Sequence, residues 1–167
     1  MTVITTVLSL SNLGIGTAAS NRFVLNYGAE TKKKAEDIFK TGFAIVTFVM
    51  ICGIVISAFV IFILNEFEVF EKSLIQKEEA IWAISLLILA RLIGFYNPLF
   101  FGRFVTARRA SLSIHLITIK TLVELGFGLL VLNLGYGIIP YAISRLAIAV
   151  LFNVFYAFKA LNVLKIE

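Results

Sequence analysis

The chain has 167 residues, of which 60% are hydrophobic and 15% are charged, and its formal net charge is +5. Soluble domains are typically about 45–50% apolar and about 25% charged, so this composition excludes a disordered chain, a disulfide-rich secreted domain and an ordinary cytosolic enzyme. With one cysteine and one histidine, we expect no disulfide within the chain, no metal centre and no other cofactor. On so apolar a chain, the positive charge indicates membrane topology rather than nucleic-acid binding.

Five apolar stretches predict helices that cross a bilayer. A membrane helix needs about 20 consecutive, mostly apolar residues. Such stretches cover residues 1–20, 43–64, 80–102, 111–132 and 138–158. They are too long for strands, and the first lacks the basic residues with which a signal peptide begins. We therefore expect an all-α, polytopic transmembrane helical bundle of about five spans, forming one truncated domain over residues 1–167.

The segments between these stretches alternate in positive charge. The charged loop 21–42, the loop 103–110 and the C-terminal tail carry Arg22, Lys32, Lys33, Lys34, Lys40, Arg103, Arg108, Arg109, Lys159 and Lys165. The segment 65–79 is mainly acidic, and 133–137 has no charge. The positive-inside rule then places the three basic segments and the C-terminus in the cytoplasm, and the N-terminus outside. Because no helix precedes that outside N-terminus, we expect a fragment that lacks an upstream helix and much downstream sequence.

Local signals predict where helices end or bend. Gly28 is expected to end the first helix, and Thr31 to cap a solvated helical extension that leads into the second span. Lys32–Lys34 in this extension are either a topology signal or a contact for an anionic lipid or substrate. Pro98 is expected to kink or loosen the third span, whereas Pro140 fits the first turn of the last one.

Four ionisable residues fall well inside the predicted spans: Arg91, Lys120, Glu124 and Arg145. Each costs at least about 2.5–3.5 kcal/mol at the bilayer centre, so we expect them to face the bundle interior or a watered cavity. Lys120 and Glu124 are four residues apart on one helix, which favours a structural ion pair over a proton relay. The remaining two arginines suit an anionic ligand such as a phosphate. Alternatively, Arg91 and Arg145 donate hydrogen bonds to carbonyl groups at helix breaks, form ion pairs with an acid on a missing segment, or contact lipid phosphates.

Polar and small residues recur on one face of each of the last two spans. At helical spacing these faces contain Ser113, Lys120, Glu124 and Gly128 in one span, and Tyr141, Arg145, Ala149, Asn153 and Tyr156 in the other. We expect both faces to point into the bundle.

The sequence does not predict an enzyme. A membrane-embedded enzyme needs a nucleophile with a base, a pair of carboxylates, or a metal. His115 is the one histidine, no span carries paired carboxylates, and the acidic segment 65–79 lacks an obvious ligand spacing.

Several motifs, taken in order, resemble oligosaccharide flippases of the Wzx type, which belong to the multidrug/oligosaccharidyl-lipid/polysaccharide exporter superfamily (MATE-like). The small-residue helix end at 13–23, followed by Lys-Lys-Lys-Ala-Glu-Asp-Ile-Phe at 32–39 and an apolar span, is similar to the second and third helices of that family. The motif Tyr-Asn-Pro-Leu-Phe-Phe-Gly at 96–102, with the basic residues after it, is similar to the exit of the fourth helix. Asn-Leu-Gly-Tyr-Gly at 133–137 is similar to the turn between the fifth and sixth helices.

The resemblance implies a fold and a function. The fold has two six-helix lobes around a cationic cavity, and this chain is similar to helices two to six of the N-terminal lobe. The implied function is to flip a polyprenyl-pyrophosphate-linked oligosaccharide, an O-antigen or capsule precursor, across the bacterial cell membrane by alternating access. The implied substrate-binding residues are Arg145 first, then Arg91, and then Arg22 at the cytoplasmic mouth. The implied partners are the lipid bilayer, the anionic lipid-linked glycan, and a missing second lobe or glycan-polymerising membrane proteins, with no nucleic acid.

Two other functions stay open. A drug/cation antiporter of the same superfamily requires a membrane acid as its ion site, and Glu124 is the one acid inside a predicted span. A non-transporting membrane scaffold has little reason to keep arginines such as Arg91 and Arg145 in its spans.

Overall fold

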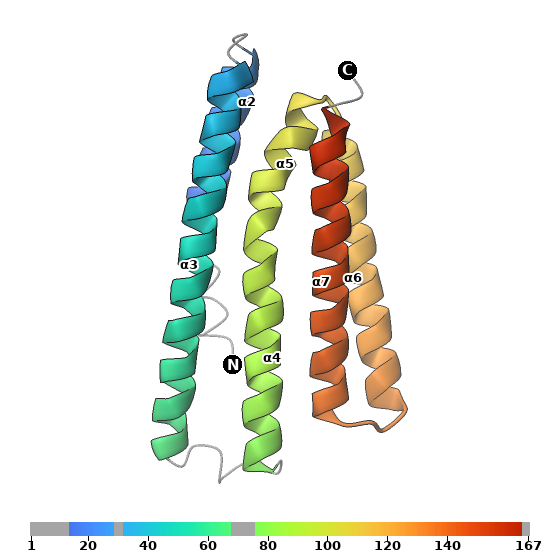
Figure 1. Cartoon of the computed structure of the whole chain (residues 1–167). Coiled ribbons are helices and arrows are strands. Elements are labelled where there is room, and N and C mark those ends of the chain that lie inside the picture. The colour runs from blue at the N-terminus through green and yellow to red at the C-terminus, as the bar shows by residue number, and fades with distance from the viewer. Residues whose placement is uncertain (1–13, 29–31, 68–75, 165–167) are drawn as a thin grey trace.

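The computed structural model describes residues 14–28, 32–67 and 76–164, and these residues are all-α. The elements are α2 (Ile15–Gly28), α3 (Lys32–Glu66), α4 (Lys77–Ile93), the 3₁₀ turn η1 (Gly94–Tyr96), α5 (Asn97–Thr106), α6 (Ala110–Asn133) and α7 (Ile138–Val163). Because α4, η1 and α5 follow one another without a gap, they form one rod, and the described residues make five helical rods (Figure 1). Four of these are long and apolar enough to cross a membrane: Lys32–Glu66, Lys77–Thr106, Ala110–Asn133 and Ile138–Val163.

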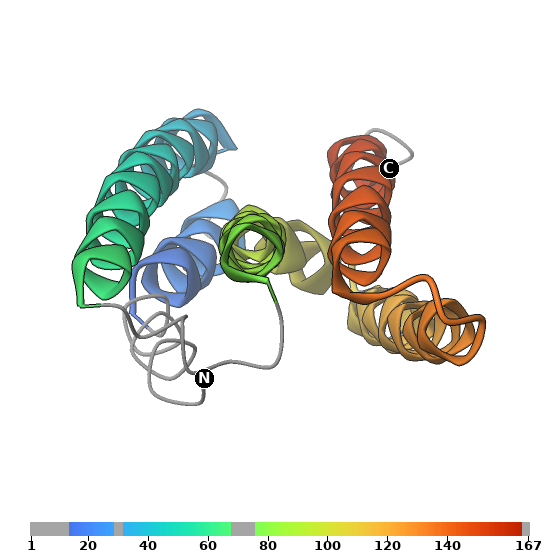
Figure 2. The ribbon, with the colours of Figure 1, turned by 90° about the horizontal axis from the view of Figure 1, so that it is seen from below.

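The rods lie side by side, with the α4–α5 rod in the middle. Seen along the helices, α2 and α3 lie on one side of this rod and α6 and α7 on the other (Figure 2). The end of α3 and the start of α4 lie at the same end of the bundle as the α6–α7 turn (Figure 1). Consequently the start of α3, the junction of α5 with α6, and the end of α7 all lie at the opposite end.

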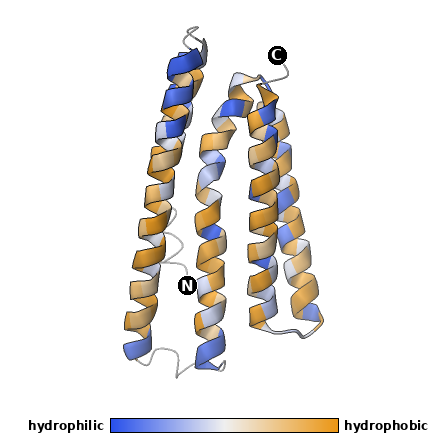
Figure 3. Ribbon diagram, viewed as in Figure 1, coloured by the Kyte–Doolittle hydropathy of each residue, from blue (hydrophilic) through white to orange (hydrophobic). Residues whose placement is uncertain are grey.

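The two ends of the bundle differ in charge. Most of the described basic residues of the loops fall at the end where α3 begins and α7 finishes. The other end carries Glu66, Glu78 and Glu79 with one lysine, Lys77, and an uncharged α6–α7 turn. Figure 3 shows hydrophilic helix ends separated by long apolar stretches. This arrangement is what the positive-inside rule requires of a multi-pass protein, and the orientation itself stays a prediction.

The predicted spans 43–64, 80–102, 111–132 and 138–158 each lie within one long helical rod. The first predicted span differs: residues 1–13 lie outside the described part, and α2 continues past residue 20 to Gly28. Gly28, where this helix was predicted to end, is the last residue of α2 before the undescribed residues 29–31.

The segment 21–42 was predicted as a charged connection that contains the end of the first helix and a helical extension of the second span. Its described residues, 21–28 and 32–42, are helical, and the extension is continuous with the second span from Lys32 onward. Thr31 lies outside the described residues. An apolar run marks only the part of a helix that suits lipid, whereas backbone hydrogen bonds continue into water wherever charged side chains can stay solvated. For the same reason α5 extends to Thr106, so the connection predicted at 103–110 begins after Thr106 instead of at residue 103.

Pro98 accounts for the interruption in the central rod. Proline has no N–H to donate, and its ring clashes with the carbonyl four residues earlier, so a regular α-helix cannot pass through it. The chain accommodates it with the 3₁₀ turn Gly94–Tyr96 and then restarts as α5 at Asn97. The predicted irregularity at Pro98 is confirmed, as is the position of Pro140 in the first turn of α7.

The buried core is aromatic and lies toward the basic end of the bundle. Phe23 of α2 packs against Phe39 of α3, with ring centroids 5.9 Å apart, and Phe104 of α5 packs against Tyr156 of α7 at 5.1 Å. The hydroxyl of Tyr156 shares a hydrogen bond with Ser113 of α6, and both residues are fully buried. This cluster therefore joins all five rods at one end.

Small residues allow close contact between helices. A Cβ at Gly42 of α3 would lie 2.7 Å from Ala19 of α2, and one at Gly102 of α5 would lie 2.6 Å from Oγ of Ser20. Such contacts are typical of helices that pack in lipid. In the α6–α7 turn, Gly135 and Gly137 have φ angles of 74° and 83°, which side chains with a Cβ rarely adopt.

Candidate functional site

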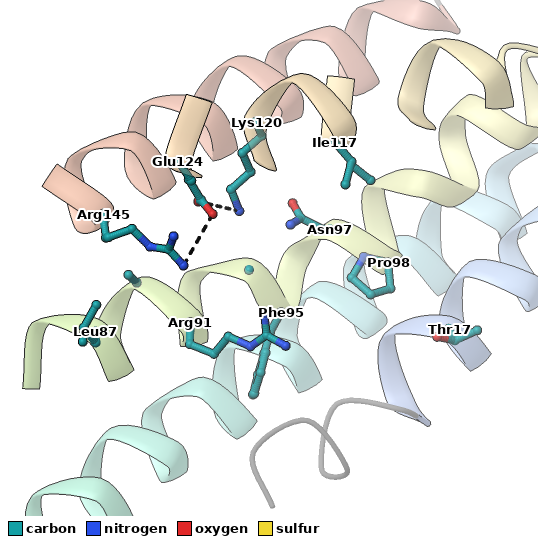
Figure 4. A pocket seen from close by; sticks show the side chains of 12 residues that line it. Thr17, Leu87, Arg91, Phe95, Asn97, Pro98, Ile117, Lys120, Glu124 and Arg145 are labelled. Atoms are coloured by element: carbon teal, nitrogen blue, oxygen red, sulfur yellow. Dashed lines mark ion pairs between the residues drawn. The ribbon is translucent and has the colours of Figure 1, made fainter. Parts of the chain in front are cut away.

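A cavity of about 400 Å³ lies in the middle of the bundle, beside the 3₁₀ turn (Figure 4). Its walls come from α2, the central rod, α6 and α7. It is lined by Thr17, Leu87, Ala90, Arg91, Gly94, Phe95, Asn97, Pro98, Ile117, Lys120, Glu124 and Arg145.

The last two helices turn their polar faces toward the bundle. The two buried residues of α6 are Ser113 and Gly128, whereas Leu122 and Leu129 are 65% and 62% exposed. A helix that exposes leucine and buries serine is unfavourable in water, whereas the same arrangement is favourable when the exposed face contacts hydrocarbon. This rotation of α6 carries Lys120 and Glu124 into the cavity wall, since they lie on the same helical face as the buried pair.

In α7 the same argument applies to the predicted polar face. Ala149, Asn153 and Tyr156 are buried, and Arg145 lies one turn before Ala149 on that face. Both polar faces expected from the sequence therefore point inward, and they meet at the cavity.

Glu124 lies between two cations. Its Oε1 is 3.4 Å from Nζ of Lys120, and its Oε2 is 3.9 Å from Nη2 of Arg145 (Figure 4). The first contact is the ion pair within α6 that the sequence predicts. The second joins α6 to α7, and nothing in the sequence identifies it. The three side chains are 14% exposed for Lys120, 16% for Glu124 and 34% for Arg145, so they are substantially withdrawn from solvent.

An aromatic ring lies near each of the two cations that contact Glu124. Nζ of Lys120 lies 5.3 Å from the ring centroid of Phe152, and the guanidinium carbon of Arg145 lies 5.8 Å from that of Tyr141. Ring faces attract cations without neutralising them. The positive charge therefore stays available at the cavity surface.

Arg91 reaches the same cavity from α4, on the wall opposite α6 and α7 (Figure 4). Arg22 does not line this cavity. It is exposed on α2, five residues after Thr17, which corresponds to about 7.5 Å along the helix toward the basic end. Of the three predicted substrate-binding residues, the structure thus places Arg91 and Arg145 together and Arg22 apart.

Asn97 and Thr17 are cavity residues that the sequence analysis did not identify. The Oδ1 atom of Asn97 is buried and accepts no hydrogen bond from any described residue, so it can accept one from a ligand hydroxyl. For Asn97, the Asn97-Pro98 dipeptide could have indicated a cavity residue, because an amide side chain at a proline-induced helix break is well placed to line a cavity.

Arg103 has a different environment from the cavity arginines. Its guanidinium lies over the ring of Phe39, 4.2 Å from the centroid, and 5.7 Å from that of Phe23. It therefore links α5 to α2 and α3 within the aromatic core.

The arrangement suits the binding of an anion. Three cations and one carboxylate line the cavity, together with the polar groups of Asn97 and Thr17. Arginine donates pairs of parallel hydrogen bonds to phosphate or carboxylate oxygens. Within the described ranges, no group of three or more His, Cys, Asp or Glu residues could hold a metal ion.

No protein-family model matches this chain, and neither a curated protein nor a solved structure matches it significantly.

Proposed function

We propose that this chain forms helices two to six of the N-terminal lobe of a flippase for polyprenyl-pyrophosphate-linked oligosaccharides in the bacterial cell membrane. The proposal combines the motifs that resemble Wzx-type flippases with the chemistry of the central cavity. The single observation that carries it is the presence of two cations, Lys120 and Arg145, beside one carboxylate, that of Glu124, in the wall of that cavity, which Arg91 also lines.

The cost of burying charge supports a ligand role. A cation at the centre of a membrane helix raises the free energy of insertion by at least about 2.5–3.5 kcal/mol. Ionisable residues that are kept there despite this cost usually mark a substrate or ion path. Arg145 is held 3.9 Å from Glu124 by an ion pair too long for a hydrogen bond, so its donors remain directed at the cavity. A diphosphate has enough negative charge and acceptor oxygens to satisfy them.

The cavity volume is consistent with a headgroup. Small-molecule sites usually have volumes of about 300–1,000 Å³. At about 400 Å³, this cavity suits a diphosphate and part of the first sugar rather than the whole oligosaccharide. The buried acceptor of Asn97 suits a sugar hydroxyl.

In this proposal the pyrophosphate binds the cations while the cavity is open to one side of the membrane. Rocking of the two lobes then opens the cavity to the other side. Because rocking requires two bodies, the chain needs its second lobe or an equivalent partner in order to transport.

A drug/cation antiporter is the second candidate, and one observation weighs against it. An antiporter needs an acid that is free to bind its ion, whereas Glu124 already contacts Lys120 and Arg145. A non-transporting scaffold is the third, and it gives no account of the cations around the cavity.

The test is glycan export by the full-length parent protein, with both lobes, carrying Arg145→Ala. We expect surface glycan to be lost while the protein is still made and inserted in the membrane. The matched control is Lys159→Ala, which removes one positive charge from the exposed face of the same helix. We expect this control to export normally. Normal export by Arg145→Ala, or equal loss in both variants, would remove the assignment.

A further inference from the structure

We propose that a groove between α2 and α5 binds a neutral sugar ring of the lipid-linked oligosaccharide, next to the site of the diphosphate. The groove has a volume of about 400 Å³, and both Thr17 and Pro98 line it as well as the central cavity, so the two spaces adjoin. Figure 4 shows these two residues at one edge of the cavity. The identity of the ligand rests on the proposed function, whereas its chemistry follows from the side chains that line the groove.

Close contacts between small residues form the floor of this α2–α5 groove. Gly16 of α2 lies against Pro98, where an added Cβ would be 3.3 Å from Cβ of the proline. One turn further along, Ser20 lies against Gly102 of α5. The two helices therefore touch along one row of residues, and the neighbouring row on each helix forms a wall.

The two walls differ in chemistry. Thr17 and Asn21 lie one turn apart on α2 and form a polar wall, whereas Phe101 and Val105 lie one turn apart on α5 and form an apolar one. No described residue that lines the groove is ionisable. A sugar ring combines hydroxyl groups with apolar C–H faces, so a hydroxyl and an amide beside an aromatic ring suit it.

The side chains of Thr17 and Asn21 have no hydrogen-bond partner among the described residues. Most serine and threonine hydroxyls of the other described helices donate to the carbonyl oxygen four residues earlier, as those of Ser57 and Thr121 do. Polar groups inside a membrane protein need a partner, because hydrocarbon offers none. The hydroxyl and the amide of the polar wall are therefore available to water or to a ligand.

The exposed face of α2 indicates that the groove borders water rather than lipid. Thr17, Asn21 and Arg22 are exposed on this helix, whereas α6 exposes mainly long apolar residues such as Leu122 and Leu129. Amide and guanidinium groups are unfavourable in hydrocarbon. This face therefore suits a hydrated sugar and does not suit the lipid tail of the substrate.

Thiol labelling tests whether the groove is hydrated. Asn21→Cys and Ile114→Cys are compared in a Cys52→Ser background, in open membrane fragments that admit reagents to both sides. Each position lies about one turn nearer the basic end than a residue of the cavity wall, Thr17 or Ile117, but Ile114 is 56% exposed on the apolar face of α6. We expect a charged reagent to label Asn21→Cys and not Ile114→Cys. If only an apolar reagent labels Asn21→Cys, the groove faces hydrocarbon and the inference is wrong.

Binding of two synthetic probes tests the sugar site itself. The probes are farnesyl diphosphate and the same lipid carrying a neutral disaccharide of N-acetylglucosamine, and their dissociation constants are measured with purified protein in neutral detergent. We expect the disaccharide to strengthen binding to the wild-type protein. Asn21→Leu, which removes the amide at similar size, should weaken binding of the disaccharide probe on the order of tenfold, or about 1.4 kcal/mol, and leave farnesyl diphosphate unaffected.

The matched control is Asn26→Leu, because Asn26 is on the same helix but does not line the groove, and its amide donates to the carbonyl oxygen of Arg22. We expect this control to bind both probes as the wild-type protein does.

The two proposals fail in different ways. If the wild-type protein binds farnesyl diphosphate but the disaccharide adds nothing, or if Asn21→Leu behaves like the control, the sugar site is refuted and the proposed function survives. If neither probe binds the wild-type protein, the central cavity is not an anion site and both proposals are overturned.

Discussion

Replacing Gly102 of α5 with alanine should weaken the contact between α5 and α2. An added Cβ would lie 2.6 Å from Oγ of Ser20 and 3.2 Å from both Cα and Cβ of that residue. The hydroxyl can rotate, but Cα belongs to the backbone of α2, so the two helices must separate by a few tenths of an ångström. Ser20 is only 5% exposed, and its surroundings leave little room for such a shift.

The expected loss follows from the cost of overpacking. Inserting an extra carbon into a well-packed contact typically costs about 1–3 kcal/mol. For a chain of this size, 1 kcal/mol corresponds to about 2–4 °C in Tm, so Gly102→Ala should lower Tm by roughly 3–9 °C.

The assay follows thermal unfolding in detergent with a thiol-reactive dye. Cys52 is the one cysteine of the chain and lies partly buried in α3, so its labelling reports opening of the bundle. The matched control is Gly126→Ala in α6, where an added Cβ meets nothing within 4 Å. Removing a glycine from a helix interior stabilises it by about 0.5–1 kcal/mol, so this control should unfold at the same temperature or higher. Equal Tm values for the two variants would refute the argument from close packing.

Two further predictions concern the core and the topology. Tyr156→Phe should lower stability by about 1 kcal/mol because it leaves the buried hydroxyl of Ser113 without this partner, and Ser113→Ala should cost little more in that background. Fully additive losses in the same thermal assay would contradict a direct hydrogen bond. In a Cys52→Ser background, Lys33→Cys and Tyr136→Cys should react with a membrane-impermeant thiol reagent from opposite sides, since they lie at opposite ends of the bundle. Labelling of both from the same side would refute the proposed topology.

The sequence predicts best what depends on local spacing. Four apolar runs locate four long helices, and the spacing of Lys120 and Glu124 predicts their ion pair, because neighbours on one helix are fixed by the helix itself. Pro98 likewise predicts the interruption of the central rod, since its effect on backbone hydrogen bonds is local.

What depends on packing between helices could not be predicted. The contact of Arg145 with Glu124 requires the relative rotation of α6 and α7, which no single periodic pattern determines. Arg22 and Thr17 both lie on α2, and only the docking of this helix decides that Thr17 lines the cavity while Arg22 does not. Charged residues stop an apolar run without stopping a helix, so α5 continues to Thr106 beyond the apolar run that ends at Gly102.

The glycine turn between α6 and α7 has a consequence for how this protein enters the membrane. Gly135 and Gly137 fold the chain back within a few uncharged residues, so the two helices can be inserted together as a hairpin. If the chain is inserted into a membrane in this way, Arg145 enters lipid already paired with Glu124, which Lys120 also contacts within α6. If α7 entered alone, Arg145 would bear the full cost of about 2.5–3.5 kcal/mol without this pairing. The pairing that shapes the cavity thus also eases the biogenesis of the helices that form it.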